Sequence, residues 1–157
     1  MKLKDLFDRW GLEGLKVKTP FLEADFQPDT ADKSAAWEMY VQLLTRITTQ
    51  KLPDDHGIEK TALDSVFSLF PVTREVLKRS GPSCIKFTQI AVIVLNQVIR
   101  PFTAKWHKLS VEGAFDEPEK CKTFRQELTE LQIELKKYTH LLSDLADVED
   151  LTDMEEA

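Results

Sequence analysis

The sequence predicts an all-α protein folded as an antiparallel bundle of four to five helices, and three observations support this prediction. The chain holds only five glycines among 157 residues, a shortage that disfavours a sheet-rich fold with many turns. Apolar residues recur at helical spacing in several segments. The strongest of these patterns is a seam of eight residues at alternating steps of three and four, which predicts one long C-terminal helix: Cys121, Phe124, Leu128, Leu131, Leu135, Tyr138, Leu142 and Leu145.

Residues 1–28 are predicted to form an N-terminal docking helix and an extended arm, ahead of a helical bundle domain at residues 29–148. Residues 3–10 place their apolar side chains on one helical face, whereas residues 15–26 alternate between apolar and polar. We expect the arm to lie across the bundle. Its aromatic residues are candidate interface residues, which either close the chain's own bundle or wrap a neighbouring subunit: Trp10, Phe21 and Phe26.

Two helical segments are predicted in the first half of the bundle domain. Asp29 or Thr30 can cap a helix that extends to about residue 50. One face of this helix is apolar and is expected to pack in the core: Ala36, Trp37, Tyr40, Leu43, Leu44 and Ile47. The second segment spans residues 58–80 and either kinks or restarts at Pro71.

The sequence of the second half of the domain predicts a central helix and a long helix that packs against it. Residues 83–100 are apolar almost all round, which is typical of the most enclosed helix of a bundle, and Pro101 is expected to kink it. The last helix, at residues 118–148, is the expected antiparallel partner. Two residues widen its seam on one flank and are further interface candidates, because part of the seam could lie between subunits: Ile133 and Leu141.

The negative charge of the chain is concentrated at its C-terminus. Residues 144–157 hold seven acids and no base, so the net charge of −6 for the whole chain becomes +1 for residues 1–143. Residues 149–157 are predicted to be an acidic tail, which solvates the terminus, shields a basic patch or docks on a basic partner. A nearly neutral body disfavours nucleic acid as a partner, because binding to the phosphate backbone needs a basic excess.

A cytoplasmic location without membrane association is expected. The N-terminus lacks the apolar core of a secretory signal, and the longest apolar run, residues 90–95, is far shorter than the roughly 20 residues that span a bilayer. Cys84 and Cys121 lack metal-type spacing and are expected to remain thiols in a reducing compartment.

The densest cluster of polar and aromatic residues is the segment RPFTAKWHK at residues 100–108. Arginine can bind a phosphate or carboxylate, lysine adds charge, tryptophan stacks and histidine titrates near neutrality. If the helix ends converge, a cationic pocket for an anionic small ligand results, with these candidate residues: Arg74, Arg100, Lys105, Trp106 and His107. A structural role, with an ion-paired arginine and a tryptophan that closes the core, is the commoner use of such residues.

No catalytic or metal-binding motif stands out. Glu127, Glu130 and Glu134 lie on one helix, whereas the acids of helical magnesium sites come from facing helices, so a solvated face is expected. The sequence lacks a zinc-protease motif, a phosphate-binding glycine loop and a serine elbow. No metal or cofactor is therefore expected, and an enzyme is less expected than a binding protein.

The sequence thus favours a non-catalytic interaction or scaffold subunit that self-associates or binds a protein partner. The alternative is a sensor domain that binds a phosphorylated or carboxylated small molecule at the cationic helix ends.

Overall fold

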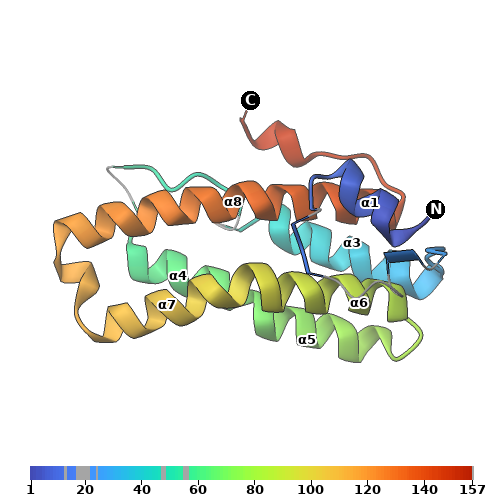
Figure 1. Cartoon of the computed structure of the whole chain (residues 1–157), viewed down its shortest axis with the longest axis horizontal. Helices are drawn as coiled ribbons and strands as arrows, with labels where there is room; N and C mark the ends of the chain where they lie inside the picture. The colour runs from blue at the N-terminus through green and yellow to red at the C-terminus, as the bar shows by residue number, and fades with distance from the viewer. Residues whose placement is uncertain (13, 17–21, 24, 47–48, 55–56, 157) are drawn as a thin grey trace.

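The computed structural model describes residues 1–12, 14–16, 22–23, 25–46, 49–54 and 57–156, and it confirms the all-α bundle. Figure 1 shows rods that run alternately in opposite directions along one long axis. Three short elements accompany the helices: a π-helical turn at Leu95–Ile99 and 3-10 turns at Ala114–Asp116 and Thr152–Glu156. The α-helices are α1 at Leu3–Arg9, α3 at Thr30–Leu44, α4 at Glu59–Phe67, α5 at Leu69–Ser80, α6 at Ile85–Val94, α7 at Arg100–Val111 and α8 at Pro118–Ala146.

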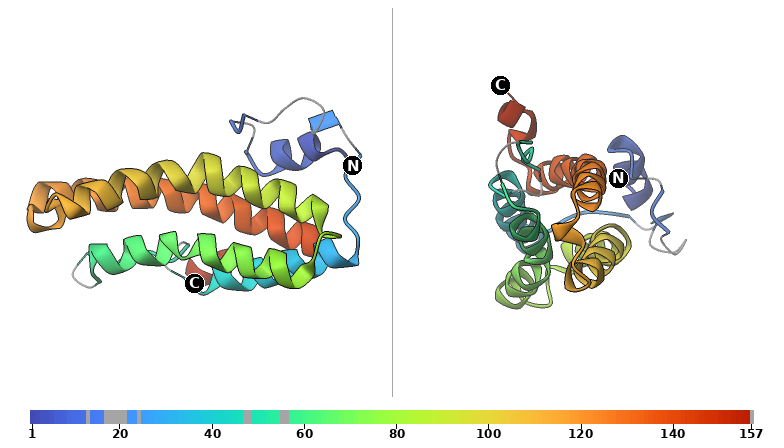
Figure 2. Two further views of the ribbon diagram at one scale, coloured as in Figure 1. Left: turned by 90° about the horizontal axis from the view of Figure 1, so that it is seen from below. Right: turned by 90° about the vertical axis from the view of Figure 1, so that its left-hand side faces the viewer.

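The helices form rods that surround a shared core when the molecule is viewed end-on (Figure 2, right). The first rod is α3, the second is α4 followed by α5, the third is α6 followed by the π-helical turn and α7, and the fourth is α8. Helix α1 lies outside this bundle, over the C-terminal part of α8. The chain after α8 turns back along the outside of the bundle (Figure 1).

The helix boundaries follow local sequence signals. Asp29 caps α3 by accepting a hydrogen bond from the Asp32 amide at 3.0 Å, as an N-cap residue should. Pro71 falls in the first turn of α5, where its missing N–H removes no helical hydrogen bond, so the segment restarts at Leu69. Gly81 ends α5 with φ 76°, a left-handed conformation that glycine adopts without steric cost.

The third rod changes its winding before Pro101. The π-helical turn at Leu95–Ile99 directly precedes α7, and Pro101 lies in the first turn of that helix. A proline ring collides with the carbonyl four residues earlier, here that of Gln97, and the wider π-helical winding changes the hydrogen-bond register at this point. The kink expected at Pro101 stays a prediction.

The apolar seam of α8 lies in the core. Seven of its eight members are buried, from Phe124 to Leu145, and Cys121 is half-buried. In contrast, the expectation that residues 83–100 form the most enclosed helix is wrong. Ile85 is 52% exposed and Val92 is 43% exposed, because this rod lies at the periphery of the bundle and these positions fall on its outer face.

A buried carboxylate joins two helix N-termini. Asp32, only 1% exposed, accepts a hydrogen bond from the Phe87 amide in the first turn of α6 at 2.9 Å. Its other oxygen accepts from the Asp29 amide at 3.0 Å. The first turn of each helix carries unpaired N–H groups and partial positive charge, so one carboxylate satisfies both ends.

The bundle should therefore depend on Asp32. We expect Asp32→Ala to lower the free energy of unfolding by about 2–3 kcal/mol, because the buried Phe87 amide and the partly buried Asp29 amide both lose a charged acceptor. Asp32→Asn should have a smaller effect, since its one carbonyl oxygen can still satisfy one amide. Urea denaturation measures both, and Glu130→Ala, which removes an exposed acid from α8, is the control. Equal stability of Asp32→Ala and this control would contradict the role of Asp32.

Removing the side-chain hydroxyl should affect the free energy of unfolding differently at the two tyrosines. Burial raises the pKa of Tyr138, and its hydroxyl forms no hydrogen bond within the described residues. The Tyr40 hydroxyl, in contrast, accepts a hydrogen bond from the Leu151 amide at 2.6 Å. We expect Tyr40→Phe to lower the unfolding free energy by about 1 kcal/mol and Tyr138→Phe to leave it unchanged or raise it by about 1 kcal/mol. The same denaturation experiment tests this. A larger loss in Tyr138→Phe would show that its hydroxyl has a stabilising partner.

Candidate functional sites

The residues of the predicted cationic cluster point to two different sides of the third rod. Arg100 donates from Nε to Asn96 Oδ1 at 3.1 Å, and its guanidinium carbon lies 4.7 Å from the centre of the Phe70 ring. His107 meets the edge of the Phe67 ring, with the ring centres 4.8 Å apart. These two side chains therefore face α4 and α5.

Lys105 and Trp106 instead face α8, where both bind one carboxylate. Lys105 Nζ lies 2.5 Å from one oxygen of Glu127, and Trp106 Nε1 donates to the other oxygen at 2.7 Å. The indole is 1% exposed and packs against Phe124, with ring centres 5.1 Å apart. Arg74 is exposed on α5. The structure thus brings together Lys105 and Trp106 through Glu127, but it does not gather the five candidates around one pocket.

The interface candidates also have different surroundings. Phe26 and Leu141 are buried in the chain's own core at 3% and 0% exposure, whereas Ile133 is 53% exposed on α8. Trp10 stacks on His140 with ring centres 5.0 Å apart and an interplanar angle of 8°. Phe21 lies outside the described residues. Among the candidates that the structure describes, Ile133 has the most exposed side chain.

The N-terminal helix and the acidic tail both dock on the C-terminal part of α8. Trp10 Nε1 donates to Asp144 at 2.6 Å, and its ring stacks on His140, which also contacts the tail. His140 pairs with Asp150 and lies 3.6 Å from Asp153. Thr152 is fully buried. The chain can return here because Asp147 ends α8 with φ 58°, a left-handed conformation that aspartate tolerates better than most residues.

Asp150 anchors the tail through several polar contacts. Its Oδ1 accepts hydrogen bonds from the Thr152 amide at 3.0 Å and from the Thr152 hydroxyl at 2.5 Å. Partial burial alone would raise the pKa of Asp150, but the hydrogen bonds from His140 and Thr152 outweigh it and hold this pKa below its ordinary value. The ionised carboxylate is therefore favoured in the docked tail.

The docked tail and α3 form a surface that mixes apolar and acidic groups. Trp37 is 47% exposed, Val41 is 37% exposed and Leu151 of the tail is 38% exposed. Tyr40 joins them, because its ring centre lies 5.9 Å from that of Trp37 and its hydroxyl binds the Leu151 amide. We call this region the α3–tail surface, which comprises Trp37, Val41, Leu151, Asp147, Glu149 and Asp153.

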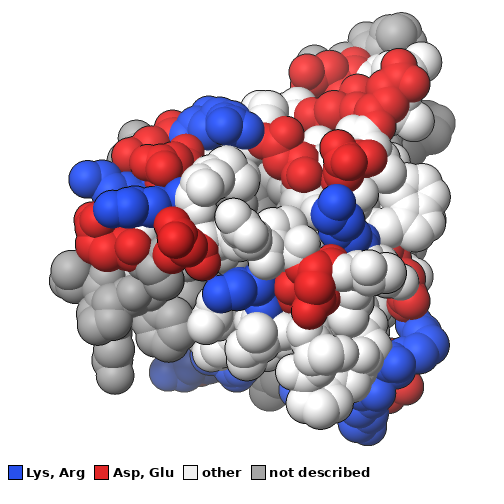
Figure 3. Space-filling view, turned by 90° about the vertical axis from the view of Figure 1, so that its right-hand side faces the viewer, with Lys and Arg blue, Asp and Glu red and all other residues white. Residues whose placement is uncertain are grey.

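Figure 3 shows the end of the molecule to which this surface belongs. Acidic side chains crowd together where the tail lies, at the upper right, and uncharged surface adjoins them below. Over the rest of this face, acidic and basic side chains are interspersed. The exposed carboxylates of Asp147, Glu149 and Asp153 give the α3–tail surface a negative border.

Trp37 is the residue that sequence reasoning placed wrongly. It was grouped with Tyr40 and Leu43 on the core face of α3, but those two are fully buried and Trp37 is half-exposed. Adjacent residues differ by about 100° around a helix, so Trp37 lies at the edge of the face that Ala36 and Tyr40 share.

Neither a metal cluster nor a membrane helix was detected in the described part of the chain. No three histidine, cysteine or acidic side chains there are arranged to hold a metal ion. None of the described helices combines the length and the apolar character needed to cross a bilayer. Both cysteines are free thiols.

Comparison of the chain with protein-family models, with curated proteins and with solved structures gives no match. The functional argument therefore depends on the geometry described above.

The docking of the tail should weaken in acid. Because the pKa of Asp150 is lowered in the folded protein, its contribution to stability is complete above the ordinary aspartate pKa of about 3.9 and is lost as the pH falls through the lower folded value. The amide shifts of Leu151 and Thr152 in NMR spectra report this titration. Asp150→Asn should remove the transition, and Asp153→Asn, at a carboxylate that is 81% exposed, is the control. A midpoint above the ordinary value would contradict the anchoring role.

Proposed function

We propose that this chain is a non-catalytic interaction module that binds a basic, partly apolar segment of another protein on its α3–tail surface. The observation that carries this proposal is the half-exposed Trp37, whose ring packs against Tyr40, the residue that binds the Leu151 amide of the docked acidic tail.

The apolar centre supplies the energetic anchor. Trp37 and Val41 lie four residues apart on α3 and so share one side of the helix. Tryptophan is enriched among the few residues that dominate binding energy at protein interfaces. The Trp37 ring packs against the ring of Tyr40, which is itself fully buried and hydrogen-bonded to the tail. A supported aromatic side chain loses less conformational entropy when a partner covers it.

The acidic border favours a basic partner. Asp147 and Asp153 have side chains that are 84% and 81% exposed, and Glu149 is exposed as well. Lys33 lies 4.0 Å from Asp147, but an exposed pair at this distance neutralises little of the local field. Lysine and arginine side chains on a partner would be attracted to this border, and like charges would be repelled.

The same border argues against self-association through this surface. A symmetric dimer would bring two acidic tails together. The self-association expected from the sequence therefore has to involve another face, such as the region of Ile133 on α8.

Photo-crosslinking can test this proposal. A photoreactive amino acid at Val41 should capture a protein in cells through a peptide rich in lysine and arginine, and Trp37→Ala should abolish the adduct. The same amino acid at Val111, which is 88% exposed on α7, is the matched control. Loss of the Trp37 side chain should reduce the affinity for the captured segment by about thirtyfold, equivalent to about 2 kcal/mol.

Three results would contradict the proposal. They are the same adducts at positions 41 and 111, adducts at position 41 that survive Trp37→Ala, and adducts at position 41 formed only with a second copy of this chain.

A further inference from the structure

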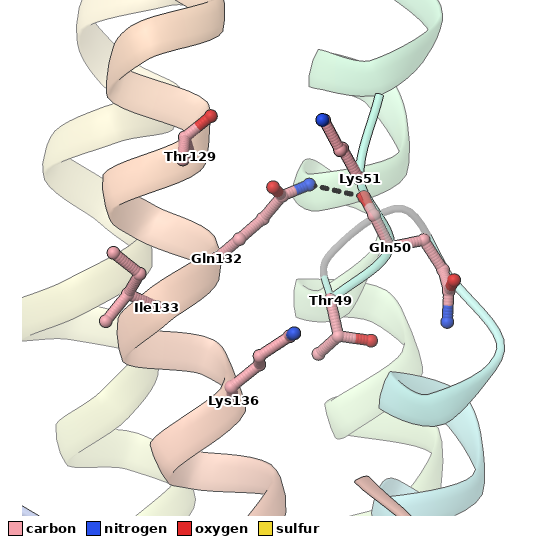
Figure 4. Close-up of a pocket in the computed structure, with 7 residues that line it drawn as sticks. All are labelled: Thr49, Gln50, Lys51, Thr129, Gln132, Ile133 and Lys136. Atoms are coloured by element: carbon pink, nitrogen blue, oxygen red, sulfur yellow. Dashed lines mark hydrogen bonds between the residues drawn. The ribbon is translucent and has the colours of Figure 1, made fainter. Parts of the chain in front are cut away.

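A pocket of about 490 Å³ lies between α8 and the segment that follows α3. Figure 4 shows its lining residues, four on α8 and three on the facing segment. A volume of this size is within the range of small-molecule sites. The lining residues are Thr49, Gln50, Lys51, Thr129, Gln132, Ile133 and Lys136.

The facing segment is held in place by polar contacts that leave the pocket open. Thr49 Oγ1 donates to the Leu43 carbonyl at 2.7 Å, and Gln50 Nε2 donates to the Leu44 carbonyl at 3.1 Å. These bonds cap the C-terminal end of α3. From the other side, Gln132 Nε2 on α8 donates to the Gln50 carbonyl at 2.6 Å. This hydrogen bond therefore ties the two walls together (Figure 4).

The charge of the lining is one-sided. Among the seven described residues that form it, two are lysines and none is acidic, although the chain as a whole has a net charge of −6. Lys136 extends from α8 toward Thr49, and Lys51 reaches toward α8 from the opposite wall, with Gln132 between them (Figure 4). Lys51 forms no ion pair within the described residues.

The helix dipole of α3 does not cancel this charge. The C-terminus of a helix carries roughly half a negative charge, and the Thr49 and Gln50 side chains already satisfy two of its carbonyls. Two lysine side chains therefore belong to the lining, Lys51 on one wall and Lys136 on the other. Thr129 adds a hydroxyl to the lining, and the half-exposed Ile133 provides an apolar edge.

We propose that this pocket binds a small organic anion, whose phosphate or carboxylate group lies between Lys51 and Lys136 and whose apolar part rests against Ile133. This site is separate from the α3–tail surface, so its test does not depend on whether the proposed protein partner exists. It also differs from the cationic cluster around Arg100, which the sequence suggested for the same class of ligand.

NMR titration of the full chain tests this site. Phenyl phosphate, benzoate and inorganic phosphate are added at millimolar concentration, with sodium chloride at matched ionic strength as the reference. We expect the side-chain amide signals of Gln50 and Gln132 to shift with phenyl phosphate or benzoate. The difference between these two probes identifies the preferred acid, and inorganic phosphate shows what the charged group contributes without the ring.

Charge-removing variants decide whether the pocket is responsible. Lys51→Gln and Lys136→Gln should each weaken binding of the responding probe by about tenfold. Lys108→Gln, at an exposed lysine on α7, removes the same charge elsewhere and should leave the affinity unchanged. Because Lys51 is exposed and forms no ion pair with any described residue, its variant should retain the native spectrum even if Lys136→Gln disturbs folding.

Either of two results would overturn the site. One is the absence of shifts at Gln50 and Gln132 beyond those caused by sodium chloride. The other is an affinity that Lys51→Gln leaves unchanged or that falls equally in Lys108→Gln, which would indicate general charge screening.

Discussion

Burial of the apolar face of α8 is the constraint on which the rest of the structure depends. This helix has 29 residues and packs against α3, α4, α7 and the π-helical turn. Its polar residues then fix the irregular segments: Arg125 binds the Pro53 carbonyl, Gln132 binds the Gln50 carbonyl and His140 binds the tail. One helix thus organises both the pocket and the α3–tail surface.

These two proposed sites share a physical logic. Each combines a rigid helix with a non-helical segment that side-chain hydrogen bonds hold in place, an arrangement in which loops carry function on a fixed scaffold. Their charges are opposite: the tail makes one surface acidic, and Lys51 with Lys136 makes the pocket basic. A net charge for the whole chain conceals this separation, because electrostatic recognition depends on the local distribution of charge.

The predicted cationic cluster illustrates how far sequence reasoning reaches. Arg100 and His107 are seven residues apart, close to two full helical turns, and both face α4 and α5. Lys105 and Trp106 fall on another side and meet Glu127. Proximity in sequence therefore identified a dense polar segment correctly, but helical rotation distributes its side chains to two neighbours. No pattern within one segment indicates which neighbour each will meet.

The sequence alone determined the helical class, the long α8 seam and the division between a nearly neutral body and an acidic tail, because periodicity and composition are local properties of the chain. Only the tertiary structure decided that Trp37 is exposed, that the tail docks on His140 and Tyr40, and that two lysines face one pocket. These features arise between segments far apart in sequence. Their geometry depends on how the rods pack, which a single segment's pattern does not encode.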